Sequence, residues 1–241
     1  MSLAKEPIFS CSGIQLALGG RKILSGVSLS ANAGQITGII GPNGAGKTSL
    51  FEVLSGRIKQ DSGQVKLEGR DVSSLSIQQR LRAGIGRTYQ SPVVPNGLSV
   101  DQVLRAARKA FLPMLSYHRA EWAANMLRFR VSGKTIAGSL DTLDRRKLLM
   151  TCLLMRRPKV LLLDEPASGL IEAELEELDQ IIRLLTLELK ICILLVEHRL
   201  ELVDSVADEV IVLDLGKRIA SGSPKTVFEH PDVQAAYFEA S

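Results

Sequence analysis

The sequence lacks any hydrophobic run long enough to cross a bilayer. Its longest run, residues 148–155, ends at Arg156 and Arg157, whereas a transmembrane helix needs about 20 mostly apolar residues. The first residues contain no apolar segment of the kind that signal peptides carry. Both absences argue against an integral membrane protein and a secreted one, so we expect a cytoplasmic protein.

Cysteine is scarce as well. The three residues Cys11, Cys152 and Cys192 are far apart and show neither metal-ligand spacing nor a disulfide framework. Cys152 and Cys192 lie in apolar segments, which favours core positions in a protein of a reducing compartment. The net charge of +4 is spread along the chain without a dense basic stripe, so we expect no nucleic-acid partner.

Strand-like and helical patterns alternate along the chain. Apolar residues make up 45% of it, which is enough for the core of one large α/β domain. The later strand-like runs are apolar throughout, as buried parallel strands are. We expect strands at residues 23–30, 35–40, 64–67, 159–163, 191–196 and 209–213.

Residues 91–144 differ from the rest because they contain helical patterns and no strand pattern. Two or three helices fit this stretch, which is broken by Pro92, Pro95 and Pro113. We therefore expect a helical subdomain inserted into a core formed by residues 1–90 and 145–241.

The most informative motif is G-x-x-x-x-G-K-[ST] at residues 41–48. A buried strand is expected before it and a helix after it, so a glycine-rich turn without a ligand is the weaker interpretation. Such a loop turns backbone N–H groups toward a polyphosphate, while Lys47 reaches the β- and γ-phosphates and Thr48 binds Mg²⁺. The predicted nucleotide-binding residues are Gly41, Pro42, Asn43, Gly44, Ala45, Gly46, Lys47, Thr48 and Ser49.

Two adjacent acids, Asp164 and Glu165, follow the apolar run that precedes them. The carboxyl end of a parallel strand is where α/β proteins bind ligands, which places both carboxylates beside the phosphate loop. We expect Asp164 to hold the Mg²⁺ shell and Glu165 to activate the water that attacks the γ-phosphate. Taken alone, such a pair is more often a turn or a helix cap.

These motifs together resemble the ATPase subunit of ABC transporters over nearly the whole chain. Residues 87–90 resemble the family's Q-loop, and His198 stands where the family has its switch histidine. The resemblance implies that Gln90 contacts Mg²⁺ or the attacking water and that His198 contacts the γ-phosphate. Residues 216–237 look most like the ATPases of branched-chain amino-acid importers.

The resemblance also implies a fold, cofactors and partners. The fold is that of a P-loop NTPase, with a RecA-like parallel sheet core, an antiparallel β subdomain and an inserted helical subdomain. ATP and Mg²⁺ are the expected ligands. The expected partners are transmembrane permease subunits, a second ABC ATPase subunit (identical or different) and a separate solute-binding protein, with the chain peripheral on the inner face of the cell membrane.

The family's signature segment, which grips the nucleotide of the other subunit, is altered here. Asp141 replaces the family's serine and Leu143 replaces a glycine. A carboxylate about 4 Å from a phosphate charge is opposed by a few kcal/mol, unless Asp141 turns away to cap the following helix. Leu143 adds a side chain where bare backbone meets ligand. The segment comprises Leu140, Asp141, Thr142, Leu143 and Asp144.

Two further positions depart from the family pattern. Leu18 stands where an aromatic residue stacks on adenine, so a weaker contact with the base is expected. Ile171 replaces an aspartate that couples the two subunits. It begins an apolar helical stripe formed with Leu175 and Leu178, so we expect it to pack with that stripe, at the surface that would face a second subunit.

Three functions fit these observations. The first is the ATPase of an importer, either as a homodimer or as one half of an asymmetric heterodimer in which the partner supplies an intact signature. The second is a soluble ABC-type ATPase of DNA repair or translation, although coiled coils and a second cassette are missing. The third is a regulatory subunit with little hydrolysis, against which the presence of Glu165 and His198 argues.

Overall fold

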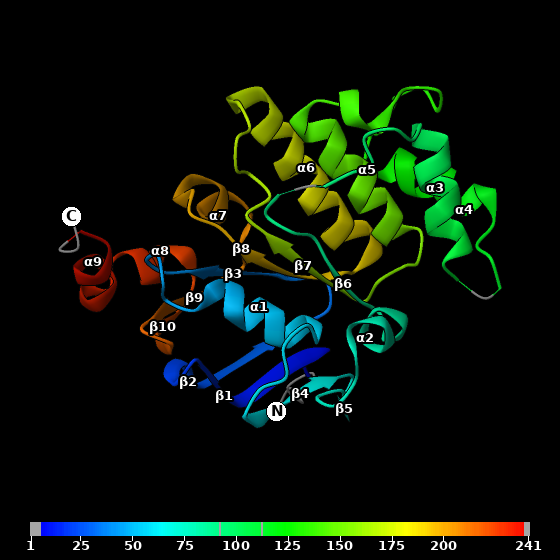
Figure 1. Cartoon of the computed structure of the whole chain (residues 1–241). Helices are drawn as coiled ribbons and strands as arrows, with labels where there is room; N and C mark the ends of the chain where they lie inside the picture. The colour runs from blue at the N-terminus through cyan, green and yellow to red at the C-terminus, as the bar shows by residue number, and fades with distance from the viewer. Residues whose placement is uncertain (1–5, 92, 112, 239–241) are drawn as a thin grey trace.

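The computed structural model describes residues 6–91, 93–111 and 113–238. Two β-sheets enclose one helix, and further helices cover the outer face of the larger sheet (Figure 1). Within the described ranges, no helix combines the length and the apolar character required to span a bilayer.

The larger sheet has the strand order β10-β9-β3-β8-β7-β6. Strands β6, β7, β8, β3 and β9 pair in parallel, and β10 pairs antiparallel with β9. The four apolar runs expected in this sheet are confirmed as β3, β7, β8 and β9. The bounds are β3 Ile36–Ile40, β6 Ile85–Arg87, β7 Val160–Asp164, β8 Cys192–Val196, β9 Glu209–Asp214 and β10 Lys217–Gly222.

The smaller sheet is antiparallel, with the order β2-β1-β4-β5. The sequence indicated β2 and β4 but missed β1. In β1 the buried positions shift by one between Cys11 and Ile14, where the pairing with β2 is irregular, so the two-residue period is interrupted. The bounds are β1 Phe9–Leu18, β2 Arg21–Ala31, β4 Ser62–Leu67 and β5 Arg70–Asp71.

Helices cover the larger sheet on both faces. α1 lies between the two sheets, while α5 and α6 lie on the opposite face (Figure 1). Every residue of β3, β7 and β8 is consequently buried. The helices are α1 Lys47–Ser55, α2 Ile77–Ala83, α3 Val100–Lys109, α4 Tyr117–Met126, the 3₁₀ turn Ala137–Ser139, α5 Thr142–Leu154, α6 Glu172–Leu189, α7 Leu200–Val206, α8 Pro224–Phe228 and α9 Pro231–Phe238.

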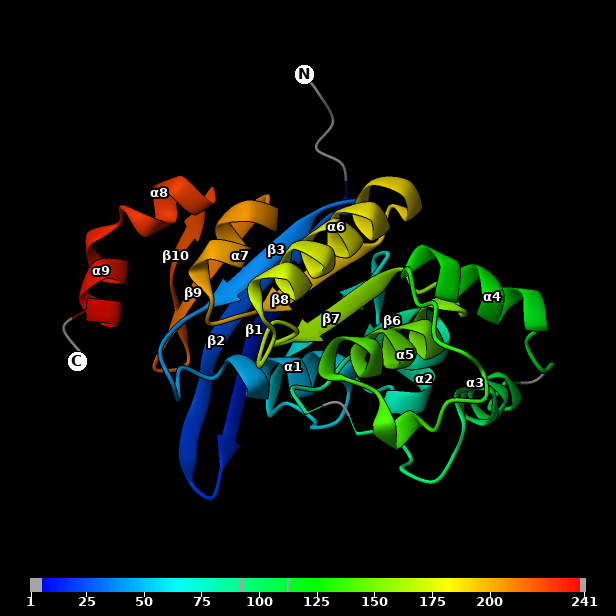
Figure 2. The ribbon, with the colours of Figure 1, turned by 90° about the horizontal axis from the view of Figure 1, so that it is seen from above.

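The segment between β6 and β7 leaves the sheet and forms α3, α4 and α5. Figure 2 shows these helices grouped beside the β6 edge of the larger sheet. Val100, Val103 and Leu148 join α3 to α5 in a small apolar cluster of their own. Both α3 and α5 begin at a side-chain cap, provided by Ser99 and Asp141.

The expectation that Ile171 packs with the apolar stripe of α6 is wrong within this chain. Leu178, Ile182 and Leu185 of α6 are buried as the stripe predicts, but the Ile171 side chain is 68% exposed. Ile171 is the residue before the helix, with an extended backbone (φ −80°, ψ 167°). The helical period does not apply to such a residue, so its side chain leaves the stripe.

Arg80 of α2 is a buried cation that joins three segments. Its Nη1 donates to the carbonyl oxygens of Val53 and Leu54 at 2.6 and 2.8 Å, and its Nη2 donates to that of Ser73 at 2.8 Å. The last carbonyls of a helix have no partner within the helix, so Arg80 satisfies the end of α1. Burial lowers the pKa of Arg80 to about 10.

Replacing Arg80 should destabilise the fold strongly. In Arg80→Leu, the carbonyls of Leu54 and Ser73 lose the Arg80 donor and that of Val53 keeps only the N–H of Gly56, and we expect the free energy of unfolding to fall by about 3 kcal/mol. Denaturant unfolding followed by circular dichroism measures this change. Arg82→Leu, on the exposed side of the same helix, serves as the control and should change stability by less than about 0.5 kcal/mol. Equal losses in the two variants would contradict this role of Arg80.

Candidate active site

The loop between β3 and α1 depends on glycine at two positions. Gly41 has φ 152°, and a Cβ atom there would lie 2.1 Å from the carbonyl oxygen of Leu213. Gly46 has φ 101°, and a Cβ atom there would lie 3.0 Å from the carbonyl oxygen of Ile23. Other residues rarely adopt these φ values, and the neighbouring backbone leaves no room for a side chain. The motif at residues 41–48 therefore forms a tight loop pressed against β2 and β9.

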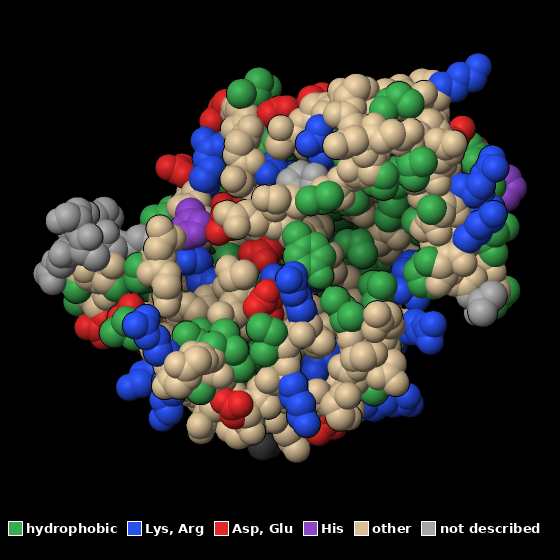
Figure 3. Space-filling view, viewed as in Figure 1, with side chains coloured by type: hydrophobic (Ala, Val, Ile, Leu, Met, Phe, Trp, Pro, Cys, Tyr) green, Lys and Arg blue, Asp and Glu red, His purple; other side chains and the backbone are tan. Residues whose placement is uncertain are grey.

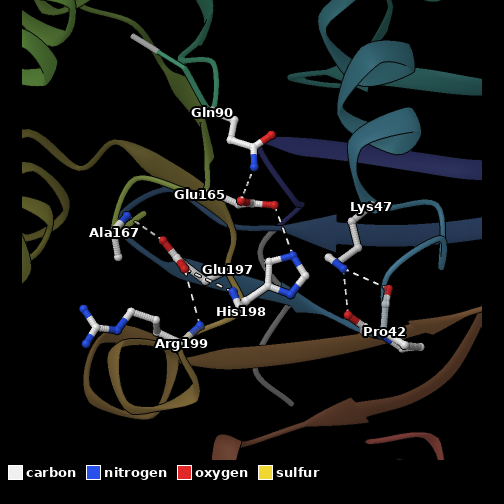
Figure 4. A network of polar contacts seen from close by, with 9 residues as sticks. Pro42, Lys47, Gln90, Glu165, Ala167, Glu197, His198 and Arg199 are labelled. Atoms are coloured by element: carbon white, nitrogen blue, oxygen red, sulfur yellow. Dashed lines mark hydrogen bonds and ion pairs between the residues drawn. The ribbon is translucent and has the colours of Figure 1, made fainter. Parts of the chain in front are cut away.

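Lys47 begins α1 and turns its side chain back over this loop. Its Nζ donates to the carbonyl oxygens of Gly41 and Pro42 at 2.7 and 3.0 Å (Figure 4). Burial lowers the pKa of Lys47, and the negative charges of Glu165 and Asp164 oppose that shift. No side chain caps the first N–H groups of α1, so these groups and the ammonium group form a donor set that suits a polyphosphate.

A hollow of about 260 Å³ lies against the loop. Acidic and basic side chains meet around it on the face seen in Figure 3. Leu18, which was expected to contact the adenine base, lies at the tip of the β1–β2 hairpin and is 42% exposed. It does not line the hollow, whereas Ile23 of the same hairpin does. The walls comprise Ile23, Asn43, Gly44, Ala45, Gly46, Lys47, Thr48, Ser49, Glu165 and His198.

Glu165 contacts side chains from two other segments (Figure 4). Its Oε2 accepts a hydrogen bond from Gln90 Nε2 at 2.6 Å, and its Oε1 lies 3.1 Å from His198 Nε2. Its backbone has φ 46°, a conformation that costs energy outside glycine and is frequent at functional sites. The structure thus brings together the three residues that the sequence singled out as catalytic.

Asp164 is buried at the end of β7 and is paired with Arg87. Arg87 Nη2 lies 2.7 Å from Asp164 Oδ2, and both side chains are 4% exposed. Arg87 also donates to the hydroxyl of Ser55 at 3.1 Å and stacks on the ring of Tyr89. No individual role was predicted for Arg87 from the sequence. Arg87 ends β6, a short strand that the sequence did not predict, and the parallel pairing of β6 with β7 places Arg87 beside Asp164.

Glu197 is a second acid that the sequence analysis left without a role. It is 2% exposed, and its carboxylate accepts hydrogen bonds from the backbone N–H groups of Ala167, His198 and Arg199 (Figure 4). Burial raises the pKa of Glu197, while these three N–H groups act in the opposite direction. Glu197 follows β8 as Glu165 follows β7, and this equivalence is visible in the sequence.

The oxygen donors of the site fit Mg²⁺ that enters with a nucleotide. Among the described residues, no group of three His, Cys, Asp or Glu side chains could hold a metal by itself. Mg²⁺ is commonly bound through one or two carboxylates together with the phosphates of the substrate. Thr48, in the wall of the hollow, and Asp164 offer oxygen donors of this kind.

Asp141 in the signature segment caps α5. Its Oδ1 accepts a hydrogen bond from the backbone N–H of Asp144 at 2.7 Å. Burial raises the pKa of Asp144, and the charge of Asp141 adds to that rise. This capping role is one of the two alternatives that the sequence left open. Asp141 therefore serves as the N-cap of α5, and its negative charge lies at the exposed N-terminus of this helix.

The side chain of Leu143 is buried against the helical region of the chain. Leu143 is 5% exposed and belongs to the same apolar cluster as Ala123 and Leu127 of the α4 region. Position 143 lies in the first turn of α5, on the side that faces the core. Leu140 is also buried, at 7% exposure, whereas Asp141 and Thr142 are exposed. Asp144 is partly exposed, so the exposed surface of the segment is formed by its polar side chains.

Comparisons with known proteins agree with the predicted fold. The family model described as ABC transporter matches residues 24–168. The chain is 33% identical to the high-affinity branched-chain amino acid transport ATP-binding protein BraF of Pseudomonas aeruginosa, and the match covers 96% of this chain and 98% of that protein. It is 31% identical to LivG of Escherichia coli, which bears the same description, with the same coverage.

A solved structure shows the same architecture. The crystal structure of the ADP form of an ATP-binding cassette of an ABC transporter superposes with a TM-score of 0.84 at 30% identity, covering 95% of this chain and 98% of that one. The predicted P-loop NTPase fold, with its parallel core, antiparallel sheet and helices, is therefore confirmed. The chain therefore belongs to the ABC transporter family, as an ATP-binding ATPase subunit. This conclusion rests on the phosphate loop, on the acids after β7 and on relatives that match nearly the whole chain.

Proposed function

We propose that this chain is the ATP-hydrolysing motor of an importer of branched-chain amino acids or similar small solutes. The contact of Glu165 with both Gln90 and His198, beside the Lys47 loop, carries the proposal of hydrolysis. The names of two relatives that transport branched-chain amino acids support the class of cargo.

ATP binds with its phosphates against the loop of residues 41–46 and the start of α1. Lys47 exchanges its two backbone acceptors for oxygens of the β- and γ-phosphates, a gain because hydrogen bonds between charged groups are the stronger ones. The hydroxyl of Thr48 and the carboxylate of Asp164 would hold Mg²⁺, which would supply positive charge to the phosphates. Arg87 fixes the orientation of Asp164 from the protein side.

Glu165 acts on the water that attacks the γ-phosphate. A carboxylate in this position takes up a proton from the water or polarises it, a role that contributes about 10²- to 10⁴-fold to a rate. Gln90 and His198 hold the two carboxylate oxygens in a defined orientation. His198, in the wall of the hollow, contacts the γ-phosphate, and Gln90 contacts the water or Mg²⁺.

The motor works in an assembly. Two ATPase subunits close on two ATP molecules and open after hydrolysis, and this motion reaches permease subunits through Gln90 and the helical subdomain, residues 91–144 between the core segments 1–90 and 145–241. Tyr89 and Val93, 42% and 81% exposed, provide apolar contact surface there. The chain is peripheral on the inner face of the cell membrane, and a separate solute-binding protein delivers the cargo.

The second ATPase subunit is a different chain. Asp141 places a negative charge at the start of α5, where the signature of this family meets the nucleotide of the partner. The residues for the chain's own nucleotide, such as Lys47 and Glu165, are all present. Such a heterodimer hydrolyses ATP at Lys47 and turns over slowly, or holds, the ATP that faces Asp141.

Glu165→Gln should abolish most ATP turnover and leave ATP binding intact. We expect kcat to fall at least about 100-fold because the amide cannot accept the proton of water, while the Kd for Mg-ATP from calorimetry changes little. Glu188→Gln, an exposed acid near the end of α6, is the control. Unchanged turnover in Glu165→Gln would contradict the proposed motor and support the regulatory alternative.

Asp141→Ser should raise the ATPase rate of the purified chain several-fold. Serine caps a helix as well as aspartate does, so stability is retained while the negative charge is removed. The rate is compared with that of Asp101→Asn, which removes a charge from the first turn of α3 and should change nothing. Rapid hydrolysis by the unmodified chain alone, unaffected by Asp141→Ser, would refute the asymmetric heterodimer.

A further inference from the structure

Glu197 is a buried acid for which the proposed reaction has no direct use. Its Oε1 accepts from the N–H of Ala167 at 2.6 Å, and its Oε2 accepts from those of His198 and Arg199 at 3.0 and 3.4 Å. At 2% exposure it has almost no contact with solvent. Burying a charge is costly unless hydrogen bonds compensate it, so these three donors account for its place in the core.

The three donors belong to two different loops. Ala167 lies in the loop after β7, which also carries Glu165, whereas His198 and Arg199 lie in the loop after β8 (Figure 4). The carboxylate of Glu197 therefore connects the backbone of one catalytic residue's loop to that of the other. The same two loops meet again through the 3.1 Å contact between Glu165 and His198.

Arg146 of α5 holds the first of these loops from its other side. Its Nη2 donates to the carbonyl oxygen of Ser168, next to Ala167. Arg146 is 7% exposed. Burial lowers the pKa of Arg146, and the negative charge of Glu197 opposes that shift. The loop after β7 is thus bonded both to an acid from the β8 loop and to a cation from α5, the helix that Asp141 caps.

We propose that Glu197 is a positioning residue that fixes Glu165 and His198 relative to each other, and that Arg146 ties this arrangement to α5. The proposal rests on the proposed function, since it assigns Glu197 to the same reaction. A shift of α5 reaches the loop of Glu165 through Ser168, and reaches His198 through Ala167 and Glu197. The signature helix of this subunit thereby acts on the subunit's own catalytic residues.

A carboxylate is required because all three partners are donors. Glutamine at position 197 has nearly the same shape but offers one acceptor oxygen and one NH₂ donor. It can accept from Ala167 or from the pair His198 and Arg199, while its NH₂ group meets an N–H on the other side. One of the two loops then loses its hydrogen bond to residue 197, while the volume of the side chain hardly changes.

The test compares Glu197→Gln with the matched control Asp208→Asn in the full chain. Asp208 also accepts a hydrogen bond from a backbone N–H, that of Ile36 at 2.8 Å, but it lies away from the hollow. We expect Glu197→Gln to lower kcat about 10- to 100-fold, the loss that misplaced catalytic groups cause, with the Kd for Mg-ATP changed less than about 3-fold. Asp208→Asn should keep the kcat of the unmodified chain. An unchanged kcat in Glu197→Gln, or an equal loss of ATP affinity, overturns the proposal.

NMR of the histidine side chains tests the positioning without turnover. The chain has only 3 histidines, at 118, 198 and 230, and His198→Ala assigns the signal of interest. In Glu197→Gln, the His198 signal should move toward its value in Glu165→Ala, because both changes remove the Glu165–His198 contact. A signal that stays at its original value overturns the proposal. If Glu165→Gln itself leaves turnover intact, the proposed function fails, and this signal still decides whether Glu197 positions His198.

The link to α5 is tested by combining Glu197→Gln with Arg146→Met. Both residues hold the same loop, so their effects on ln kcat should be strongly non-additive. Additive effects would show that Arg146 acts independently, and would overturn the connection to α5. Circular dichroism of each variant confirms that the comparison is made between folded proteins.

Discussion

The parallel pairing of β7 with β8 controls the geometry of the site. Asp164 pairs in register with Val196, so the residues that follow, Glu165 and Glu197, leave the sheet next to each other. Adjacent parallel strands end at the same edge, and their loops share one region of space. The contact of Glu165 with His198 and the bonds of Glu197 to both loops follow directly from this register.

Buried charges near that edge are each compensated within the protein. Asp164 is paired with Arg87, Glu197 is surrounded by backbone N–H groups, and Lys47 is bound to carbonyl oxygens of its own loop. Removing one partner of such a pair is far more costly than the pair is stabilising, because the remaining charge is left in a poor solvent. The charged groups assigned to ATP binding and hydrolysis therefore also contribute to the stability of the fold.

The signature segment shows how one stretch serves both fold and contact. Asp141 and Thr142 are exposed at the start of α5, whereas Leu140 and Leu143 are buried. Position 143 lies in the first turn of α5, on the side that faces the core. The same helix carries Arg146, which reaches the loop after β7. A change at the surface of α5 and a change near Glu165 are thus mechanically related.

The sequence by itself determined the phosphate loop, the acid pair and four of the five parallel strands of the larger sheet, because each of these is a local pattern. It missed β1, where an irregularity at the middle of the strand interrupts the period, and it misplaced Ile171, which precedes its helix. The partners of Asp164 and Glu197 were decided only by tertiary structure. Such contacts join residues far apart in the chain, and strand register and helix packing, which no local pattern encodes, bring them together.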